Sequence, residues 1–172
     1  MLVTDLNPSE YDDNTRYYLS KVPSVPLLQA LEESQQTTAL FFDAIPEKKQ
    51  TFRYAEQKWT IKDILQHLID VDRVFTYRAL RFGRGDTTSL PGFEEDDYAL
   101  SAHANDRSMT DLIEEFIAVK TGTLLLFKSL PADVLSNTGI ASGNPISVRA
   151  AGFKLVGHDK HHREVIQERY LK

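Results

Sequence analysis

Apolar residues recur three or four positions apart along most of the chain, which is the spacing of a buried helix face. This spacing predicts a short helix after Pro8 and four long helices of about twenty residues each. No stretch shows the sustained alternation of apolar and polar residues that is typical of a strand. We expect the long helices at residues 24–46, 60–85, 108–131 and 147–171, with a loop at residues 137–145.

Capping residues support these bounds. Thr60 followed by Asp63 is typical of the first turn of a helix, and Ser108 begins a second Ser-x-x-Asp start. The connection at residues 87–98 is long and rich in turn residues, which favours a crossover along the bundle over a tight hairpin. The sequence therefore predicts an all-α fold, a four-helix bundle formed by a single domain over residues 1–172.

Three histidines fall on the apolar faces of two of these helices. His158 and His162 are four residues apart, so their imidazoles project from one face of the last helix and can share a metal ion. His67 lies within the apolar stripe of the second long helix and is the candidate third ligand, whereas His161 lies well round the last helix from the other two. The alternative is that His158 and His162 are ordinary polar residues and His67 is a hydrogen-bonded core histidine.

The composition limits the kinds of site that the chain can form. It contains no cysteine, so a metal must be held by nitrogen and oxygen atoms, and the protein suits a reducing cytosol. The net charge is −5 with acidic and basic residues interspersed, which argues against nucleic acid as a partner. The first residues do not form a signal peptide, and no apolar run approaches the about 20 residues of a membrane span, so we expect a cytoplasmic protein without a membrane partner.

The chain resembles the DinB-like superfamily over nearly its full length. The matching pattern has six parts: Tyr17-Tyr18-Leu19, Trp59, residues 67–80 from His67 to Leu80, Leu90-Pro91-Gly92-Phe93, Asn105-Asp106-Arg107-Ser108, and residues 157–171. The resemblance implies a four-helix bundle with a divalent metal ion held by one histidine of the second long helix and the pair on the last. By position these ligands are His67, His158 and His162, and none is replaced.

The resemblance also implies the classes of reaction to consider. Members with an assigned activity include transferases and isomerases that depend on a low-molecular-weight thiol, and others are described as hydrolases. We therefore expect a metal-dependent enzyme that acts on a small molecule, with zinc as the first choice of metal and nickel, manganese or iron as alternatives. The competing hypothesis is a non-catalytic metal-binding or ligand-sensing bundle. Under either hypothesis a homodimer is a candidate assembly.

Several charged residues near the histidines are assigned to structural roles. Asp159 is expected at the surface, with support of a ligand imidazole as the alternative. Arg78 and Arg169 fall close to the histidine-bearing faces, where pairing with buried carboxylates or helix-terminal carbonyls is preferred over binding an anionic substrate. The acidic run at residues 94–97 lacks the spacing of a calcium loop and is interpreted as a solvated face.

Overall fold

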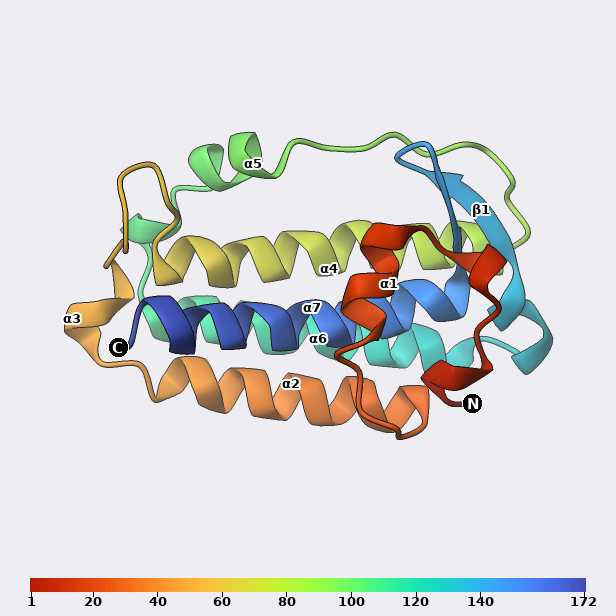
Figure 1. Ribbon diagram of the computed structural model, residues 1–172, viewed down its shortest axis with the longest axis horizontal. Coiled ribbons are helices and arrows are strands. Elements are labelled where there is room, and N and C mark those ends of the chain that lie inside the picture. The colour runs from red at the N-terminus through yellow and green to blue at the C-terminus, as the bar shows by residue number, and fades with distance from the viewer.

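The computed structural model describes all residues from Met1 to Lys172, and four long helices form its bundle (Figure 1). These helices are α2 (Leu27–Asp43), α4 (Ile61–Gly83), α6 (Met109–Ser129) and α7 (Val148–Arg169). The predicted four-helix bundle is therefore confirmed. The shorter elements are α1 (Asp13–Leu19), α3 (Glu47–Gln50), α5 (Glu95–Ser101), β1 (Thr138–Ala141), β2 (Asn144–Ser147) and the 3₁₀ turns η1 (Val3–Asp5), η2 (Pro8–Glu10), η3 (Ala104–Asp106) and η4 (Ala132–Ser136).

The order of the helices around the bundle brings α4 beside α7. Helix α4 packs against α6 and α7, and α2 packs against the same two helices, so α2 and α4 are diagonal. Helices α4 and α6 run in the same direction (Figure 1). Asn105, just before α6, hydrogen-bonds Thr60 and Asp63 at the start of α4, at 2.9 and 2.8 Å. The chain between α4 and α6 must therefore return along the whole bundle, which is the predicted crossover and carries α5.

Side-chain caps fix where three of the long helices begin. In α4 the predicted capping box is present: the Thr60 amide donates to Asp63 Oδ2 at 2.9 Å, and the Asp63 amide donates to Thr60 Oγ1 at 3.1 Å. Ser108 caps α6 and Ser147 caps α7 in the same way, each hydroxyl accepting a bond from a first-turn amide. None of the helices is both long and apolar enough to cross a membrane.

A small β-hairpin corrects the expected loop at residues 137–145. Strands β1 and β2 pair antiparallel through the two-residue turn of Ser142 and Gly143, whose φ angles are 53° and 79°. Positive φ at both turn positions matches the twist of a hairpin. Each strand has only four residues, too few for a sustained alternation to be visible in the sequence. The hairpin is joined to the crossover by bonds between Leu90 and both Ile140 and Ser142.

A polar layer divides the core of the bundle into two apolar halves. One half contains Phe75, Phe127 and Phe153, and the other contains Phe42 and Phe116. Between these halves, every long helix contributes buried or half-buried polar side chains: Ser34 and Thr38 from α2, His67 and Asp72 from α4, Lys120 and Thr123 from α6, and His158, Asp159 and His162 from α7. The three candidate ligands therefore lie near the middle of the bundle.

Within this layer Asp159 is buried, so its expected surface position is wrong. Its side chain accepts a bond from Ser34 Oγ at 2.9 Å and lies 2.7 Å from Lys120 Nζ. The same ammonium lies 2.8 Å from Asp72 Oδ2, and Thr123 donates to the other oxygen of Asp72. Asp159 follows His158 in the sequence but belongs to a buried Asp-Lys-Asp cluster formed by Asp72, Lys120 and Asp159.

Candidate metal centre

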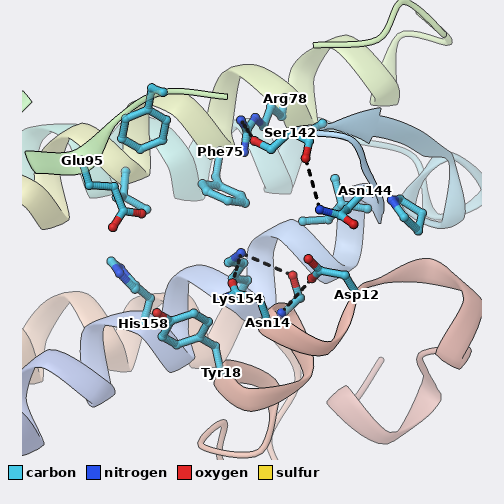
Figure 2. Close-up of a pocket in the computed structure, with 16 residues that line it drawn as sticks. Asp12, Asn14, Tyr18, Phe75, Arg78, Glu95, Ser142, Asn144, Lys154 and His158 are labelled. Carbon is cyan, nitrogen blue, oxygen red and sulfur yellow. Dashed lines mark hydrogen bonds between the residues drawn. The ribbon is translucent and has the colours of Figure 1, made fainter. Parts of the chain in front are cut away.

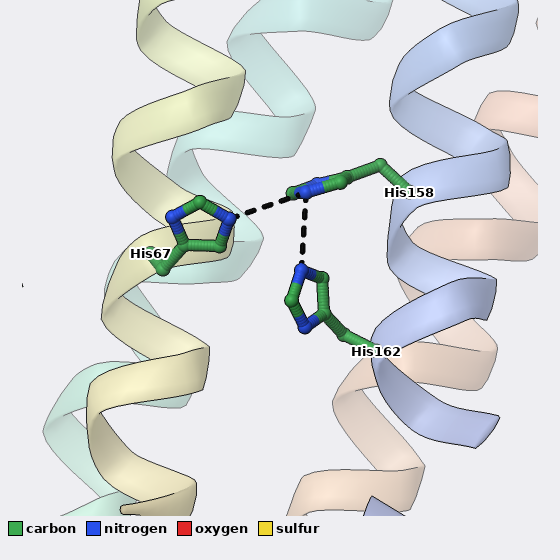
Figure 3. A group of neighbouring side chains, drawn as sticks. All are labelled: His67, His158 and His162. Carbon is green, nitrogen blue, oxygen red and sulfur yellow. Dashed lines mark hydrogen bonds between the residues drawn. The ribbon is translucent and has the colours of Figure 1, made fainter. Parts of the chain in front are cut away.

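Adjacent antiparallel helices bring the three predicted histidines together. His67 projects from α4, while His158 and His162 project from successive turns of α7 (Figure 3). The Nε2 atom of His158 lies 3.2 Å from Nε2 of His67 and 3.1 Å from Nε2 of His162. One ligand atom from each residue falls within 4.8 Å of the others. The geometry assembles the predicted set, and the role of these residues as metal ligands remains a prediction.

Burial keeps all three imidazoles neutral near pH 7. It lowers the pKa of His67 to about 4, with a smaller contribution from His161. The pKa values of His158 and His162 are lowered well below their usual range, first by burial and then by neighbouring histidines. A metal ion binds imidazole through the lone pair of its neutral form, so burial prepares these side chains as ligands.

The convergence of three Nε2 atoms fits a cation better than a hydrogen-bonded core. A neutral imidazole carries one N–H donor and one acceptor nitrogen, so His158 Nε2 cannot form a strong bond with both neighbours at once. The Nδ1 atom of His162 is buried with no hydrogen-bond partner. A divalent cation at the point of convergence would accept lone pairs from all three Nε2 atoms and remove the conflict at His158, with the proton of His162 then carried on Nδ1.

Aromatic side chains close the cluster on two sides. The Trp59 ring lies 4.6 Å from the ring of His67, and the Tyr18 ring lies 5.1 Å from that of His158. Helix α1 can place Tyr18 here because residue 157 is glycine: a Cβ at this position would lie 2.0 Å from the Tyr18 carbonyl oxygen. As predicted, His161 lies outside the cluster, with its Nδ1 atom 3.1 Å from the Tyr17 hydroxyl.

Two cavities adjoin the cluster from different sides. The His158 cavity has a volume of about 340 Å³ and is bordered by His158, Arg78 and Lys154. The His162 cavity has a volume of about 300 Å³ and is bordered by His162 and by Trp59, which is half-buried. The cluster therefore has access to two separate spaces that could hold small molecules.

The position of Glu95 was not predicted from the sequence. The residues of the acidic run are exposed as expected, yet Glu95 borders both cavities, and Figure 2 shows its carboxylate on the same side of the His158 cavity as His158. Although the residue as a whole is exposed, partial removal of its carboxylate from water at the cavity wall raises the pKa of Glu95, and the charge of Lys154 partly offsets this rise. Nothing in the sequence distinguishes this residue from its acidic neighbours, because its place depends on how the crossover lies over α4.

The arginines near the cluster differ from their expected pairing. Arg78 is buried and bonds the Pro91 carbonyl and the Ser142 hydroxyl, at 3.0 and 2.9 Å, so its partners are neither carboxylates nor helix-terminal carbonyls. Arg169 bonds the Tyr54 hydroxyl at 3.2 Å. The preferred pairing is therefore wrong for both residues, and for Arg78 it leaves a buried cation beside a cavity.

The comparison with protein families decides the classification. A model described as the DinB superfamily matches residues 30–166, which include all three histidines and all four long helices except the ends of α2 and α7. The chain belongs to the DinB superfamily. No curated protein matches the sequence at a significant level.

Two solved structures have the fold of this DinB superfamily protein. One is YfiT from Bacillus subtilis, described as a probable metal-dependent hydrolase with an unusual four-helix bundle topology. It matches with a TM-score of 0.71 and 16% identity, covering 83% of this chain and 82% of YfiT. The other is a mycothiol-dependent maleylpyruvate isomerase, with a TM-score of 0.67 and 10% identity, covering 81% of this chain and 60% of the isomerase. At these identities the likeness shows the fold.

Proposed function

We propose that this DinB superfamily protein is a metal-dependent enzyme that holds one divalent ion through His67, His158 and His162 and acts on a small molecule. The observation that carries the proposal is the convergence of three neutral imidazole nitrogens within 4.8 Å, between two cavities. A closed structural site would have a fourth protein ligand, whereas three histidines leave a coordination position free.

Zinc is the metal that we propose, with nickel, manganese and iron as alternatives that imidazole ligands also suit. When bound, such an ion lowers the pKa of a water molecule or thiol at its free position and so supplies a nucleophile near neutral pH. The chain contributes the orientation of the three imidazoles, a water-poor environment from Trp59 and Tyr18, and space for reactants on both sides.

A thiol-dependent transfer or isomerisation is the reaction class that we favour. A reaction between a thiol and a second small molecule needs room for two reactants, and the histidine cluster adjoins two cavities of similar volume, about 340 and 300 Å³. The isomerase with the same fold is named as mycothiol-dependent, which agrees with a low-molecular-weight thiol as cosubstrate. Hydrolysis is the second candidate, favoured by the description of YfiT as a probable metal-dependent hydrolase.

Elemental analysis of protein purified without a histidine tag or chelator tests the metal site. We expect about one equivalent of a divalent metal per chain in the wild type and a large loss in His67→Ala and His158→Ala, because each substitution removes one of three ligands. His161→Ala is the matched control on the same helix and should retain the metal, since His161 lies outside the cluster. Unchanged metal content in His67→Ala and His158→Ala would disprove the proposed ligand set.

The competing proposal is a non-catalytic bundle in which the ion only stabilises the fold. The two proposals differ in solvent access to the metal. Loading the wild type with manganese and measuring water proton relaxation should detect at least one exchanging water if the site is open. A filled site would give no such relaxation enhancement and would favour the structural role.

A further inference from the structure

The His158 cavity contains two cationic side chains in addition to the candidate ligand. Lys154 lies one helical turn before His158 on α7, and Arg78 reaches the cavity from α4. Figure 2 shows both in the cavity wall, with Arg78 at the end away from His158 and Glu95. The side chains of Arg78 and Lys154 each lie 4.7 Å from the centre of the Phe75 ring, so both cations contact the same aromatic side chain of the wall.

Arg78 is a buried guanidinium without a carboxylate partner. Only 4% of its surface is exposed, and no acidic oxygen lies within 4.0 Å of it. Both of its hydrogen bonds leave from one terminal nitrogen, to the Pro91 carbonyl and to Ser142 Oγ, which leaves its other N–H donors without a protein partner. These free nitrogens are not fully buried and therefore open to the cavity, where an anion from outside the chain can pair with a guanidinium that is otherwise largely removed from water.

Local structure holds the guanidinium in this position. Ser142 has a positive φ of 53° in the hairpin turn, and its backbone amide bonds Leu90 of the crossover at 3.0 Å. The hairpin and the crossover therefore contact Arg78 together, through Ser142 and Pro91. Groups that are fixed before binding lose little conformational freedom when a ligand arrives, which favours a binding role.

Lys154 provides a second positive charge with neutral partners. Its ammonium lies 3.1 Å from Asn14 Oδ1 and 3.3 Å from Thr15 Oγ1 and forms no ion pair. Burial lowers the pKa of Lys154, and the charge of Arg78 adds to this effect, while Asp12 and Glu95 oppose it. The charge of Arg78 thus acts on Lys154, and an anion near both would relieve their mutual repulsion.

Two carboxylates also border the cavity, and neither forms an ion pair with Arg78 or Lys154. Asp12 caps α1 and accepts a bond from the Thr15 amide at 2.8 Å. Glu95 lies at the end of the cavity near His158 (Figure 2). Arg78, Lys154 and Asp12 therefore lie toward one end of the cavity, where the Asp12 carboxylate is already engaged by the first turn of α1, and Glu95 lies at the other end with the histidine cluster.

We infer that Arg78 and Lys154 bind a carboxylate group of the substrate, which places the rest of a small organic acid toward His158. Because Arg78 Nη2 donates to both Pro91 and Ser142, a carboxylate would accept one charge-assisted bond from a free N–H of Arg78 and one from the Lys154 ammonium, so that each of its two oxygens has one cationic donor. The volume of about 340 Å³ is at the small end for ligand sites and agrees with a small acid. The identification of this acid as the substrate rests on the proposed function, whereas its binding does not.

Titration of isotope-labelled protein followed by NMR tests this site with defined probes. The probes are acetate and succinate, with acetamide as the neutral analogue of acetate and inorganic phosphate as a competing anion, all at constant ionic strength. We expect saturable binding of acetate and succinate with shifts in residues around the His158 cavity, and no binding of acetamide. Binding should weaken about tenfold in Arg78→Met and several-fold in Lys154→Met, because each removes a charge-assisted bond.

Arg84→Met is the matched control, since Arg84 is an exposed arginine just after α4 and away from the cavity, and it should bind like the wild type. Lys154→Met keeps the test valid if Arg78→Met does not fold. Equal carboxylate affinity in both variants and the wild type, tight binding of phosphate but not of carboxylates, or no saturable binding would each overturn the inference.

Metal analysis of the same samples separates this inference from the proposed function. The carboxylate site should persist in chelator-treated wild type, because its bonds come from Arg78 and Lys154. Carboxylate binding in protein that never retains metal would support the anion site and contradict the metal-dependent enzyme. Normal metal content together with a carboxylate affinity that does not depend on Arg78 would contradict the anion site and leave the metal-dependent enzyme supported.

Discussion

At the scale of single residues, Lys120 is the group on which the polar layer depends most. Its ammonium is buried between Asp72 and Asp159, at 2.8 and 2.7 Å. Lys120→Met would leave two buried carboxylates without their shared cation, so we expect a loss of about 3–5 kcal/mol in the free energy of unfolding. Urea denaturation measures this loss. Lys128→Met, which changes an exposed lysine of the same helix, should alter stability by less than about 0.5 kcal/mol.

A small stability change in Lys120→Met would contradict this expectation. If Lys120→Met unfolds within about 1 kcal/mol of the wild type, the two carboxylates must share a proton or be hydrated without the lysine. Asp159 is the group most prone to take up that proton, because burial raises its pKa even though Lys120 opposes the rise.

The sequence predicted the histidine set at this scale but not the charged cluster. His67 interrupts an apolar stripe, and the spacing of His158 and His162 fixes them on one face of a helix. Helical periodicity alone therefore identifies all three as candidate ligands. Lys120 also interrupts such a stripe, between Phe116 and Leu124. Periodicity gives the face of a helix and not the partner that lies across from it, so the Asp-Lys-Asp cluster required the three-dimensional arrangement.

At the scale of elements, the contact of α1 with α7 depends on Gly157. Gly157→Ala would place a methyl group 2.0 Å from the Tyr18 carbonyl oxygen if nothing moved, so α1 must shift away. We expect a net loss of about 1–3 kcal/mol, because this overpacking outweighs the gain in helix propensity of up to about 1 kcal/mol. Thermal or urea unfolding measures the change.

Gly122→Ala adds the same methyl group to another long helix, and here we expect no loss of stability. Gly122 lies inside α6, and an added Cβ would meet no atom within 4 Å. This variant should be neutral or more stable by up to about 1 kcal/mol. If both variants shift stability in the same direction, the α1–α7 contact does not constrain residue 157.

The start of α7 is tied to the N-terminal segment by Glu10, which makes part of the stability depend on pH. Ser147 Oγ and Arg149 Nε donate to the Glu10 carboxylate at 2.7 and 2.8 Å. Burial alone raises the pKa of Glu10, but these bonds outweigh it and lower the pKa from 4.5 to about 2. A carboxyl with a lowered folded-state pKa stabilises the protein above pH 4.5, and this contribution is lost as the pH falls toward 2.

Glu10→Gln should therefore lose about 1–2 kcal/mol at pH 7, less than the pKa shift alone implies because Arg149 is partly exposed and solvent screens the pair. The difference in unfolding free energy between variant and wild type should shrink as the pH is lowered from 4.5 to 3. Urea unfolding at several pH values measures it. A difference that stays constant over this range would mean that the Glu10 charge contributes nothing.

Elements differ in how well the sequence predicted them, for physical reasons. The long helices carry many turns of the same periodicity and end in recognisable caps such as Thr60 and Ser108, so their bounds were nearly correct. The hairpin at Thr138–Ser147 depends instead on a two-residue turn and on bonds to Leu90, which is distant in sequence. Interactions of that range leave almost no local pattern.

At the scale of the whole molecule, the crossover topology explains why a site forms at all. Helices α4 and α7 are antiparallel neighbours only because the chain returns along the bundle between α4 and α6 (Figure 1). A long connection predicted the crossover, but helical periodicity does not state which helices become neighbours. The resemblance to the DinB-like superfamily implied that one histidine of the second long helix and the pair on the last helix meet, and the family model confirms the membership.

The same arrangement predicts how metal removal affects the whole bundle. An ion held by His67 and by the pair on α7 would bridge two helices that are far apart in sequence, and the unfolded chain does not present these ligands together. Binding to the folded state alone, at about a hundred times the dissociation constant, adds about 2.7 kcal/mol to the free energy of unfolding. For a chain of 172 residues this corresponds to a rise in Tm of roughly 5–10 °C.

Differential scanning calorimetry of metal-loaded and chelator-treated protein measures this rise. His158→Ala should melt at the same temperature with and without metal, because it lacks the central ligand of the cluster, while His161→Ala should keep the shift of the wild type. The apolar halves of the core lie on both sides of the polar layer and do not involve the ion, so the metal-free protein should remain folded. Complete unfolding on chelation would instead assign the ion a structural role, and an equal shift in His158→Ala would place the metal at another site.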